Sequence, residues 1–372
     1  MRAGDFDADE LAAWLRLLET PQIGRGSARR LLAAFGSPQA VIAASVAQRR
    51  EVVGAGPAHA LAQVCEGADE LLALTLAWLA QTDGPQRHLV ALGDPDYPAA
   101  LLETADPPLL LYAIGRVELL RSESLAIVGS RNPTPQGREN AQAFAAELGR
   151  AGLTTVSGLA LGIDGAAHDG ALQSPASTVA VVGTGLDQVY PKRHLGLAKR
   201  IASEGLIVSE YSLGTPPLAA NFPLRNRIIA GMTRGTLVVE AALQSGSLIT
   251  ARLALEAGRE VFAIPGSIHA PQAKGCHALI KQGAKLVECA RDVLEELHWP
   301  GLGEADSSTT TPTPSSAHPI MEAMGYDPIG LDELVRRTGW SAAELNVRLL
   351  ELELDGRVAR LPGQCFQRIG QG

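Results

Sequence analysis

The stretch SLAIVGSRNPTPQGRENAQAFAAELGRAGLTTVSGLALGIDGAAHDGALQSPASTVAVV, residues 124–182, decides the fold of this chain. Three short apolar runs, at Leu125–Val128, Thr154–Val156 and Val179–Val182, alternate in it with helical patterns at Gly137–Ala151 and Asp164–Leu172. Short buried strands that alternate with amphipathic helices predict a parallel sheet covered by helices on both faces.

The alternation continues to about residue 297. Further strands are predicted at Leu206–Val208, Leu237–Val239 and Glu260–Ile264, and further helices at His194–Glu204, Asn226–Gly231 and Ser247–Ala257. The predicted fold class is therefore α/β with a doubly wound sheet. In such sheets ligands bind beyond the carboxyl ends of the strands, near the switch in strand order.

The flanking regions differ from this pattern. Residues 1–90 predict a helical domain, in which residues 9–82 carry short helical patterns and no convincing strand. The turn Gly24–Gly26 opens an arginine-containing helix, which fits a DNA-binding helix-hairpin-helix or, as we favour, a small helical packing module. Residues 91–299 form the α/β domain, and the Ser-, Thr- and Pro-rich residues 300–318 predict a flexible linker. Residues 319–372 predict a winged helix, whose acidic third helix fits protein contact at least as well as DNA.

Composition excludes several classes of protein. The chain has 372 residues and a formal net charge of −8, so any nucleic-acid site must be local. Four scattered cysteines without a CxxC pair predict neither a zinc ribbon nor a disulfide framework. An acidic N-terminus and the absence of a long uncharged apolar run predict a cytoplasmic protein without a membrane segment.

Glycine-bearing turns follow several of the predicted strands. The first is Gly129-Ser130-Arg131, and the others lie at residues 157–164, 183–187 and 244–250. Free amides of such turns and of helix starts attract anions, and Arg131 adds a phosphate clamp. Neither a P-loop nor a complete dinucleotide fingerprint is present, because Gln188 stands where the third glycine belongs.

The segment LAANFPLRNRIIAGMTRG, residues 218–235, is a cationic window. It carries Arg225, Arg227, Arg234 and the aromatic Phe222, and no acidic residue occurs from Tyr211 to Val239. Cations beside a stacking ring predict a groove for single-stranded nucleic acid. An arginine-bearing loop paired with acids elsewhere in the fold explains the window equally well.

Acid–base chemistry finds little support in the sequence. His168 follows Asp164 by four residues, which fits a catalytic dyad, but we favour an N-cap aspartate near a packing histidine. Glu210 and Glu240 follow strands, as an acid does in hydrolases of nucleotide N-glycosidic bonds. Residues 241–255 contain no acid, however, which weakens the alternative of a nucleotide phosphoribohydrolase.

Several motifs together resemble one family. They are IVGSR (127–131), SGLALGIDGAAH (157–168), GTGLDQVYPKRH (183–194), SEY (209–211), NFPLRNRIIAG (221–231) and VVEAALQSGSLITARLALEAGREVFAIPG (238–266). In order and spacing they resemble the DprA (Smf) DNA-processing family, over residues 94 to about 297. The resemblance is looser for the outer domains, which are similar to that family's helical N-terminal and winged-helix C-terminal modules.

The resemblance implies a non-enzymatic protein with an extended Rossmann-like domain. This domain would bind single-stranded DNA, form a homodimer and load the RecA recombinase during natural transformation, without a cofactor, a metal or a catalytic residue. DNA contacts map to Arg131, Lys192, Phe222 and Arg225. Many relatives carry a lysine shortly before the phenylalanine, where this chain has Leu218-Ala219-Ala220, and Arg193 is the candidate substitute. The full predicted DNA-binding set is Gly129, Ser130, Arg131, Gly158, Gly185, Lys192, Arg193, Asn221, Phe222, Arg225, Asn226, Arg227, Gly246 and Ser247.

Overall fold

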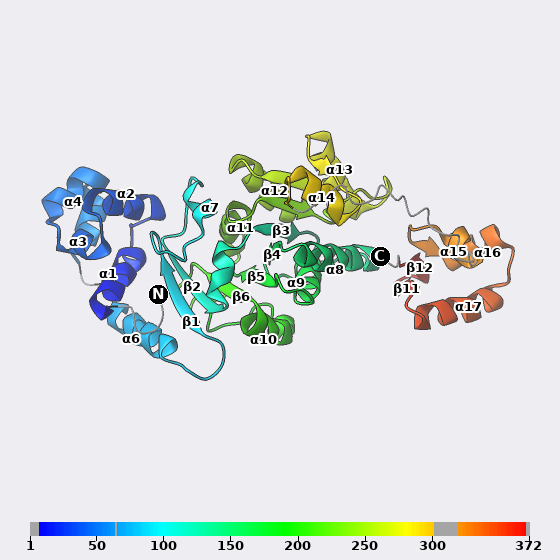
Figure 1. The fold of residues 1–372 in the computed structure, drawn as a ribbon, viewed down its shortest axis with the longest axis horizontal. Coiled ribbons are helices and arrows are strands. Elements are labelled where there is room, and N and C mark those ends of the chain that lie inside the picture. Colours follow the sequence, from blue (N-terminus) through cyan, green and yellow to red (C-terminus); the bar gives the residue numbers. More distant parts are fainter. Residues whose placement is uncertain (1–6, 64, 301–318, 370–372) are drawn as a thin grey trace.

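A computed structural model describes residues 7–63, 65–300 and 319–369 (Figure 1). A large sheet occupies the middle of the molecule, the N-terminal helices lie at one end and a small helical unit lies at the other. The predicted α/β fold is therefore confirmed.

The central sheet has nine strands in the order β1-β2-β6-β5-β4-β3-β7-β8-β9. Strands β3 to β9 run parallel, while β1 and β2 form an antiparallel edge. The order reverses at β3, which pairs with both β4 and β7, so the switch point lies there. The strands are β1 (Arg87–Ala91), β2 (Leu110–Gly115), β3 (Ser124–Val128), β4 (Thr154–Ser157), β5 (Thr178–Val181), β6 (Leu206–Ser209), β7 (Gly235–Val238), β8 (Glu260–Ala263) and β9 (Lys285–Leu286).

Helices cover both faces of this sheet because alternate strand residues are apolar on each side. One face packs against α8 (Pro135–Arg150), α9 (Ile163–Ala171), α10 (Leu195–Glu204) and α14 (Ala290–Glu296). The other packs against α11 (Asn221–Gly231), α12 (Ser247–Glu256) and α13 (Lys274–Lys281). Shorter elements are α7 (Ala99–Leu102), η1 (Val117–Arg121), η2 (Lys192–His194) and η3 (Pro271–Ala273).

The N-terminal helices share a core with the antiparallel edge. Leu11, Leu15 and Trp78 pack in one cluster with Leu89 of β1 and Tyr112 of β2. The predicted boundary after residue 90 therefore cuts through β1, a strand that the sequence prediction missed. The helices are α1 (Ala8–Glu19), α2 (Arg25–Phe35), α3 (Pro38–Ala43), α4 (Val46–Val53), α5 (Ala55–Ala60) and α6 (Ala68–Leu79).

The C-terminal unit is the predicted winged helix. It consists of α15 (Pro319–Met324), β10 (Ile329–Gly330), α16 (Leu331–Thr338), α17 (Ala342–Leu354), β11 (Val358–Leu361) and β12 (Cys365–Arg368). The short β10 adds a third strand to the predicted pair. The buried residues of the winged helix form a separate core. Of the predicted linker, residues 301–318 lie outside the described residues.

One helix begins earlier than predicted. Helix α11 starts at Asn221 rather than at Asn226, and so includes Phe222 and Pro223 in its first turn. Proline is tolerated there because the first amides of a helix have no intrahelical partner. The cationic window is consequently helical for most of its length.

Candidate functional site

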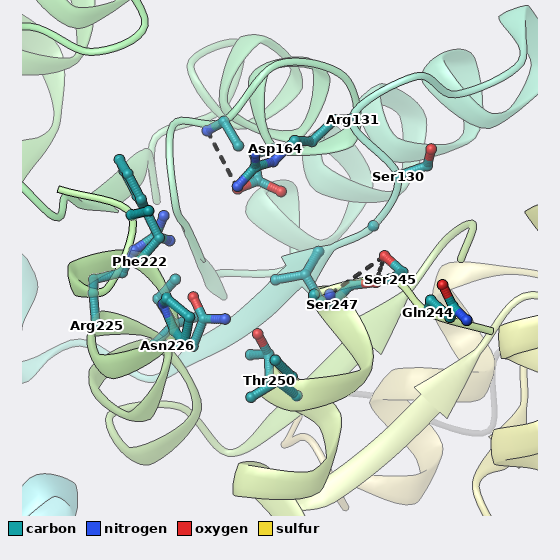
Figure 2. A pocket seen from close by; sticks show the side chains of 18 of the residues that line it. Ser130, Arg131, Asp164, Phe222, Arg225, Asn226, Gln244, Ser245, Ser247 and Thr250 are labelled. Atoms are coloured by element: carbon teal, nitrogen blue, oxygen red, sulfur yellow. Dashed lines mark hydrogen bonds between the residues drawn. The ribbon is translucent and has the colours of Figure 1, made fainter. Parts of the chain in front are cut away.

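An open cleft of about 670 Å³ lies at the carboxyl ends of the strands, next to the switch point at β3. Segments far apart in the sequence form its walls. Figure 2 shows side chains that face this space: Phe222, Arg225 and Asn226 from α11, Ser245, Ser247 and Thr250 from the region of the α12 start, and Ser130, Arg131 and Asp164.

Arg225 is a buried cation in the wall of the cleft. Only 5% of the residue is exposed, and its guanidinium lies against Gly158, where a Cβ atom would come within 1.6 Å of Nη1. Burial lowers the pKa of Arg225 to about 10, and the nearby Asp164 opposes this shift. Arg225 is therefore charged at neutral pH, and its Nε has no hydrogen-bond partner among the residues that the structure describes.

Arg131 supplies a second cation at the rim. It is exposed in the loop after β3, and no ion pair of Arg131 is found in the described part of the chain. Backbone bonds hold the loop: the Ser130 amide donates to Glu240 O at 2.7 Å, and Ile163 N donates to Ser130 O at 3.1 Å. The charge of Arg131 is thus available on a fixed backbone.

Two aromatic rings stand together at the cleft. The Phe222 and Tyr190 centroids lie 5.4 Å apart with an interplanar angle of 38°, and Tyr190 is 46% exposed. Gly183 lies beside Phe222, because a Cβ atom there would come within 3.2 Å of the ring. The sequence prediction missed Tyr190, although an aromatic residue directly before Pro191-Lys192 in a strand-end segment was a usable signal.

Other predicted residues reach the same region. Asn226, Gly246 and Ser247 line the cleft, and Gly246 precedes the first turn of α12 without a side-chain cap. Lys192 and Arg193 are exposed in η2, which directly follows Tyr190. They are not among the lining residues and would extend a basic rim beyond the cleft.

Of the turn amides predicted to bind anions, those of Ser130, Gly158, Gly185 and Gly246, the first three already have partners in the fold, so the prediction is wrong for them. The amides of Ser130 and Gly185 donate to backbone oxygens, and the Gly158 amide donates to Asp164 Oδ2 at 3.1 Å. The N-terminus of α8 is also not free to bind an anion. There the Glu240 carboxylate accepts hydrogen bonds from the Thr134 amide, at 2.9 Å, and from the Thr134 hydroxyl. Glycines at these turns serve close packing, since a Cβ atom on Gly129 would lie 2.7 Å from Ile163.

Two residues of the cationic window that were predicted to contact DNA, Asn221 and Arg227, are instead engaged within the protein. Asn221 is buried, and its Nδ2 donates to Gly183 O at 3.2 Å. Arg227 pairs with Glu210 and, at 2.9 Å, with Asp106. Arg234 lies before β7, at the opposite end of the sheet, and pairs with Glu123. For Arg227 and Arg234 the alternative of internal ion pairs therefore describes the structure.

The Asp164–His168 pair is structural. Asp164 Oδ2 accepts from the Gly158 and Ala160 amides and fixes that turn, whereas the N-cap of α9 is Gly162, so the predicted capping role is wrong. The fully buried His168 accepts from Leu159 N at Nε2 and contacts Thr178 Oγ1 through Nδ1. Burial lowers the pKa of His168 to about 3, which keeps the ring neutral. The expected packing role of His168 is confirmed.

Within the described residues, no group of three or more His, Cys, Asp or Glu side chains is arranged to hold a metal ion. The helices of the ranges 7–63, 65–300 and 319–369 are all too short or too polar to cross a membrane.

Comparison with known proteins identifies the family. Residues 88–298 match the model of DNA recombination-mediator protein A, and residues 304–364 match that of the DprA winged helix domain. The chain belongs to the DprA (Smf) family. It is 44% identical to the protein Smf of Escherichia coli K12 over 297 residues, which cover 78% of this chain and 79% of that protein. This family is one of DNA-processing proteins, as the resemblance implied.

Two solved structures support the assignment. DNA processing protein A of Streptococcus pneumoniae superposes with a TM-score of 0.68 at 37% identity, over 80% of this chain and 99% of that one. DNA processing protein A of Helicobacter pylori, whose structure is described for its single-stranded DNA binding mode, gives a TM-score of 0.52 at 31% identity. That match covers 57% of this chain and 96% of the other.

Proposed function

We propose that this chain binds single-stranded DNA in the cleft, without sequence preference. The observation that carries the proposal is that Arg131, Arg225 and the Phe222–Tyr190 pair meet at one cleft although they come from distant segments. Cations neutralise phosphates and release counterions, and aromatic faces stack on bases of any kind. The single-stranded DNA binding described for the relative from Helicobacter pylori supports the same assignment.

The geometry favours an unpaired strand over a duplex. A base must leave its neighbours to lie on Phe222, which a single strand permits at low cost. Removal of such a stacking ring costs about 1–3 kcal/mol. Arg225 lies deep in the wall and Arg131 at the rim, so successive phosphates could follow the cleft toward the exposed Lys192 and Arg193.

We further propose that the protein is a cytoplasmic recombination mediator that protects incoming strands and loads RecA during natural transformation. A homodimer through the α/β domain is part of this proposal, supported by two exposed apolar residues, Leu286 of the edge strand β9 and Ile268 in the loop after β8. Ile268→Asp should then shift the sedimentation coefficient toward that of a monomer. A wild-type chain that sediments as a monomer would exclude the dimer.

We also propose that the site is not catalytic. Asp164 is the one carboxylate among the residues that line the cleft in the described structure, and it is occupied by two backbone amides. A nucleotide phosphoribohydrolase needs an acid free to act on the N-glycosidic bond. Release of free base from nucleoside monophosphates by the purified protein would restore that alternative.

The direct experiment is a comparison of labelled single- and double-stranded oligonucleotides by fluorescence anisotropy over a salt series. We expect tighter binding of the single strand at every salt concentration, with similar affinity for poly-dT and for a mixed sequence. Preference for the duplex, or strong dependence on base sequence, would contradict the proposal.

A further inference from the structure

The third helix of the winged helix carries an apolar stripe on its solvent side. Val347, Leu350 and Leu354 are 60%, 55% and 81% exposed. At 100° per residue these three and Ala343 fall within about 60° of one another around α17. The buried Leu345, Leu349 and Leu352 lie on the opposite side and pack into the winged-helix core. The stripe is therefore a second apolar face that the fold of this domain does not use.

Carboxylates flank the stripe on both sides. Glu344 and Glu351 lie along one side and Glu353 along the other, while Asp355 follows the helix end. Arg348 is the only basic residue of α17, and it is paired with Glu351 at 2.8 Å. A single exposed apolar residue needs no explanation, but three at helical spacing with acidic borders have the pattern of a helix-pairing surface.

We infer that α17 is a docking surface for a partner helix that carries an apolar stripe bordered by lysine or arginine. The apolar residues would pack against Val347, Leu350 and Leu354, and the basic residues would face the carboxylates. Charges beside a helix-pairing stripe select the partner and its orientation. The surface lies on a different domain from the DNA cleft, so the two can act independently.

Two other occupants fit less well. Nucleic acid is disfavoured, because the helix that a winged helix usually presents to DNA would bring carboxylates against phosphates. Three basic side chains of this domain lie instead on or next to the wing, at Arg357, Arg360 and Arg368, while Arg336 and Arg337 of α16 pair with Glu333. A second copy of α17 would place Glu351 and Glu353 near the same residues of its partner, and like charges at a helix-pairing seam disfavour it.

The test uses the full chain and two stapled helical peptides, both with leucines at every third and fourth position. One peptide has lysines beside the leucines and the other has glutamates at the same positions. Anisotropy should show binding of the lysine peptide at least about tenfold tighter than that of the glutamate peptide. The affinity for the lysine peptide should fall as salt rises, because exposed charges are screened.

Variants give the decisive contrast. Leu350→Asp should weaken binding of the lysine peptide by about tenfold or more, whereas Leu74→Asp, at a 48% exposed leucine of α6, should not. Charge reversal by E351K with E353K should invert the preference between the two peptides. The affinity for poly-dT, carried by the cleft, should be unchanged in all variants, which separates this inference from the proposed function.

Four results would overturn the inference. Equal binding of both peptides would contradict the charge selectivity, and wild-type affinity of Leu350→Asp for the lysine peptide would contradict docking on α17. Displacement of the lysine peptide by a duplex oligonucleotide would assign the helix to nucleic acid. Self-association of the wild-type chain that Leu350→Asp abolishes would assign it to a second copy.

Discussion

Gly158 shows how a residue without a side chain can position a charge, here that of Arg225. Its guanidinium occupies the space where residue 158 would carry a Cβ atom, and Asp164 holds the backbone of the same turn through two amides. The position of the buried cation therefore depends on the backbone of this turn. A change in the position of Arg225 would change the wall of the cleft.

Gly158→Ala should consequently reduce DNA binding. The new methyl group would displace the Arg225 guanidinium and remove a charged contact, at a cost of about 1.5–3 kcal/mol in binding free energy. Poly-dT anisotropy measures the effect, and Gly26→Ala is the matched control, because no atom lies within 4 Å of a Cβ atom there. Equal affinities of the two variants would show that the position of Arg225 does not matter.

His168 should make the stability of the fold depend on pH. Its folded-state pKa of about 3 lies below its ordinary value of 6.5, so the unfolded chain takes up the proton first. Its contribution to stability is complete above pH 6.5 and is lost as the pH falls toward 3. Between pH 7 and pH 5 the loss should be about 2 kcal/mol.

Urea unfolding at these two pH values measures this contribution. The bond from Leu159 N to Nε2 requires a neutral ring, since a protonated Nε2 cannot accept. His168→Gln should be less stable at both pH values and should lack this part of the pH dependence. A variant that keeps the full wild-type pH dependence would contradict the assignment.

At the scale of elements, helix α11 divides the cationic window between two tasks. Arg225 and Arg227 lie about 200° apart around the helix, so they face different surroundings. Arg225 enters the cleft, whereas Arg227 joins a cluster in which Arg25 and Arg29 of α2 also contact Asp106. The cluster ties the N-terminal helices to α11, the helix that carries Phe222, Arg225 and Asn226 at the cleft.

Arg227→Ala should therefore destabilise the protein rather than weaken a phosphate contact. It removes a cation from the mostly buried Glu210, and the loss of one partner of a buried pair costs about 3–5 kcal/mol. Thermal unfolding reports the loss. The slope of log affinity for poly-dT against log salt, measured below the melting temperature, should match the wild type. A reduced slope of log affinity against log salt in Arg227→Ala would instead indicate that Arg227 contacts a phosphate.

The sequence predicted the sheet well, and the residues of the cleft only in part. Strands such as β3 and β5 were found because their apolar runs are a local signal, and the carboxyl-edge location followed from the α/β pattern. Ion pairs such as Arg227–Asp106 join residues far apart in the chain, and no local pattern reveals them. The acceptor of the Ser130 amide, Glu240 O, is invisible in the sequence for the same reason.

At the scale of the whole molecule, the two outer units are joined to the sheet in different ways. The N-terminal helices complete the apolar core over β1 and β2, whereas the winged helix has a core of its own. A chain that ends at Pro300 should bind poly-dT with the affinity and salt dependence of the full protein.

Deletion of residues 1–84 should instead expose Leu89 and Tyr112, at a cost of about 1.5–3 kcal/mol for each large apolar side chain. Differential scanning calorimetry of the two shortened chains distinguishes these outcomes. Cooperative unfolding near the wild-type temperature after the N-terminal deletion would contradict the shared core.

The salt dependence of DNA binding by Arg131→Ala tests the central claim most directly. The account predicts weaker binding of poly-dT and of mixed sequences alike, with a slope of log affinity against log salt reduced by about 0.7 for one lost phosphate contact. Arg150→Ala, at the exposed C-terminal end of α8, should match the wild type. Wild-type affinity and slope in Arg131→Ala would contradict the account.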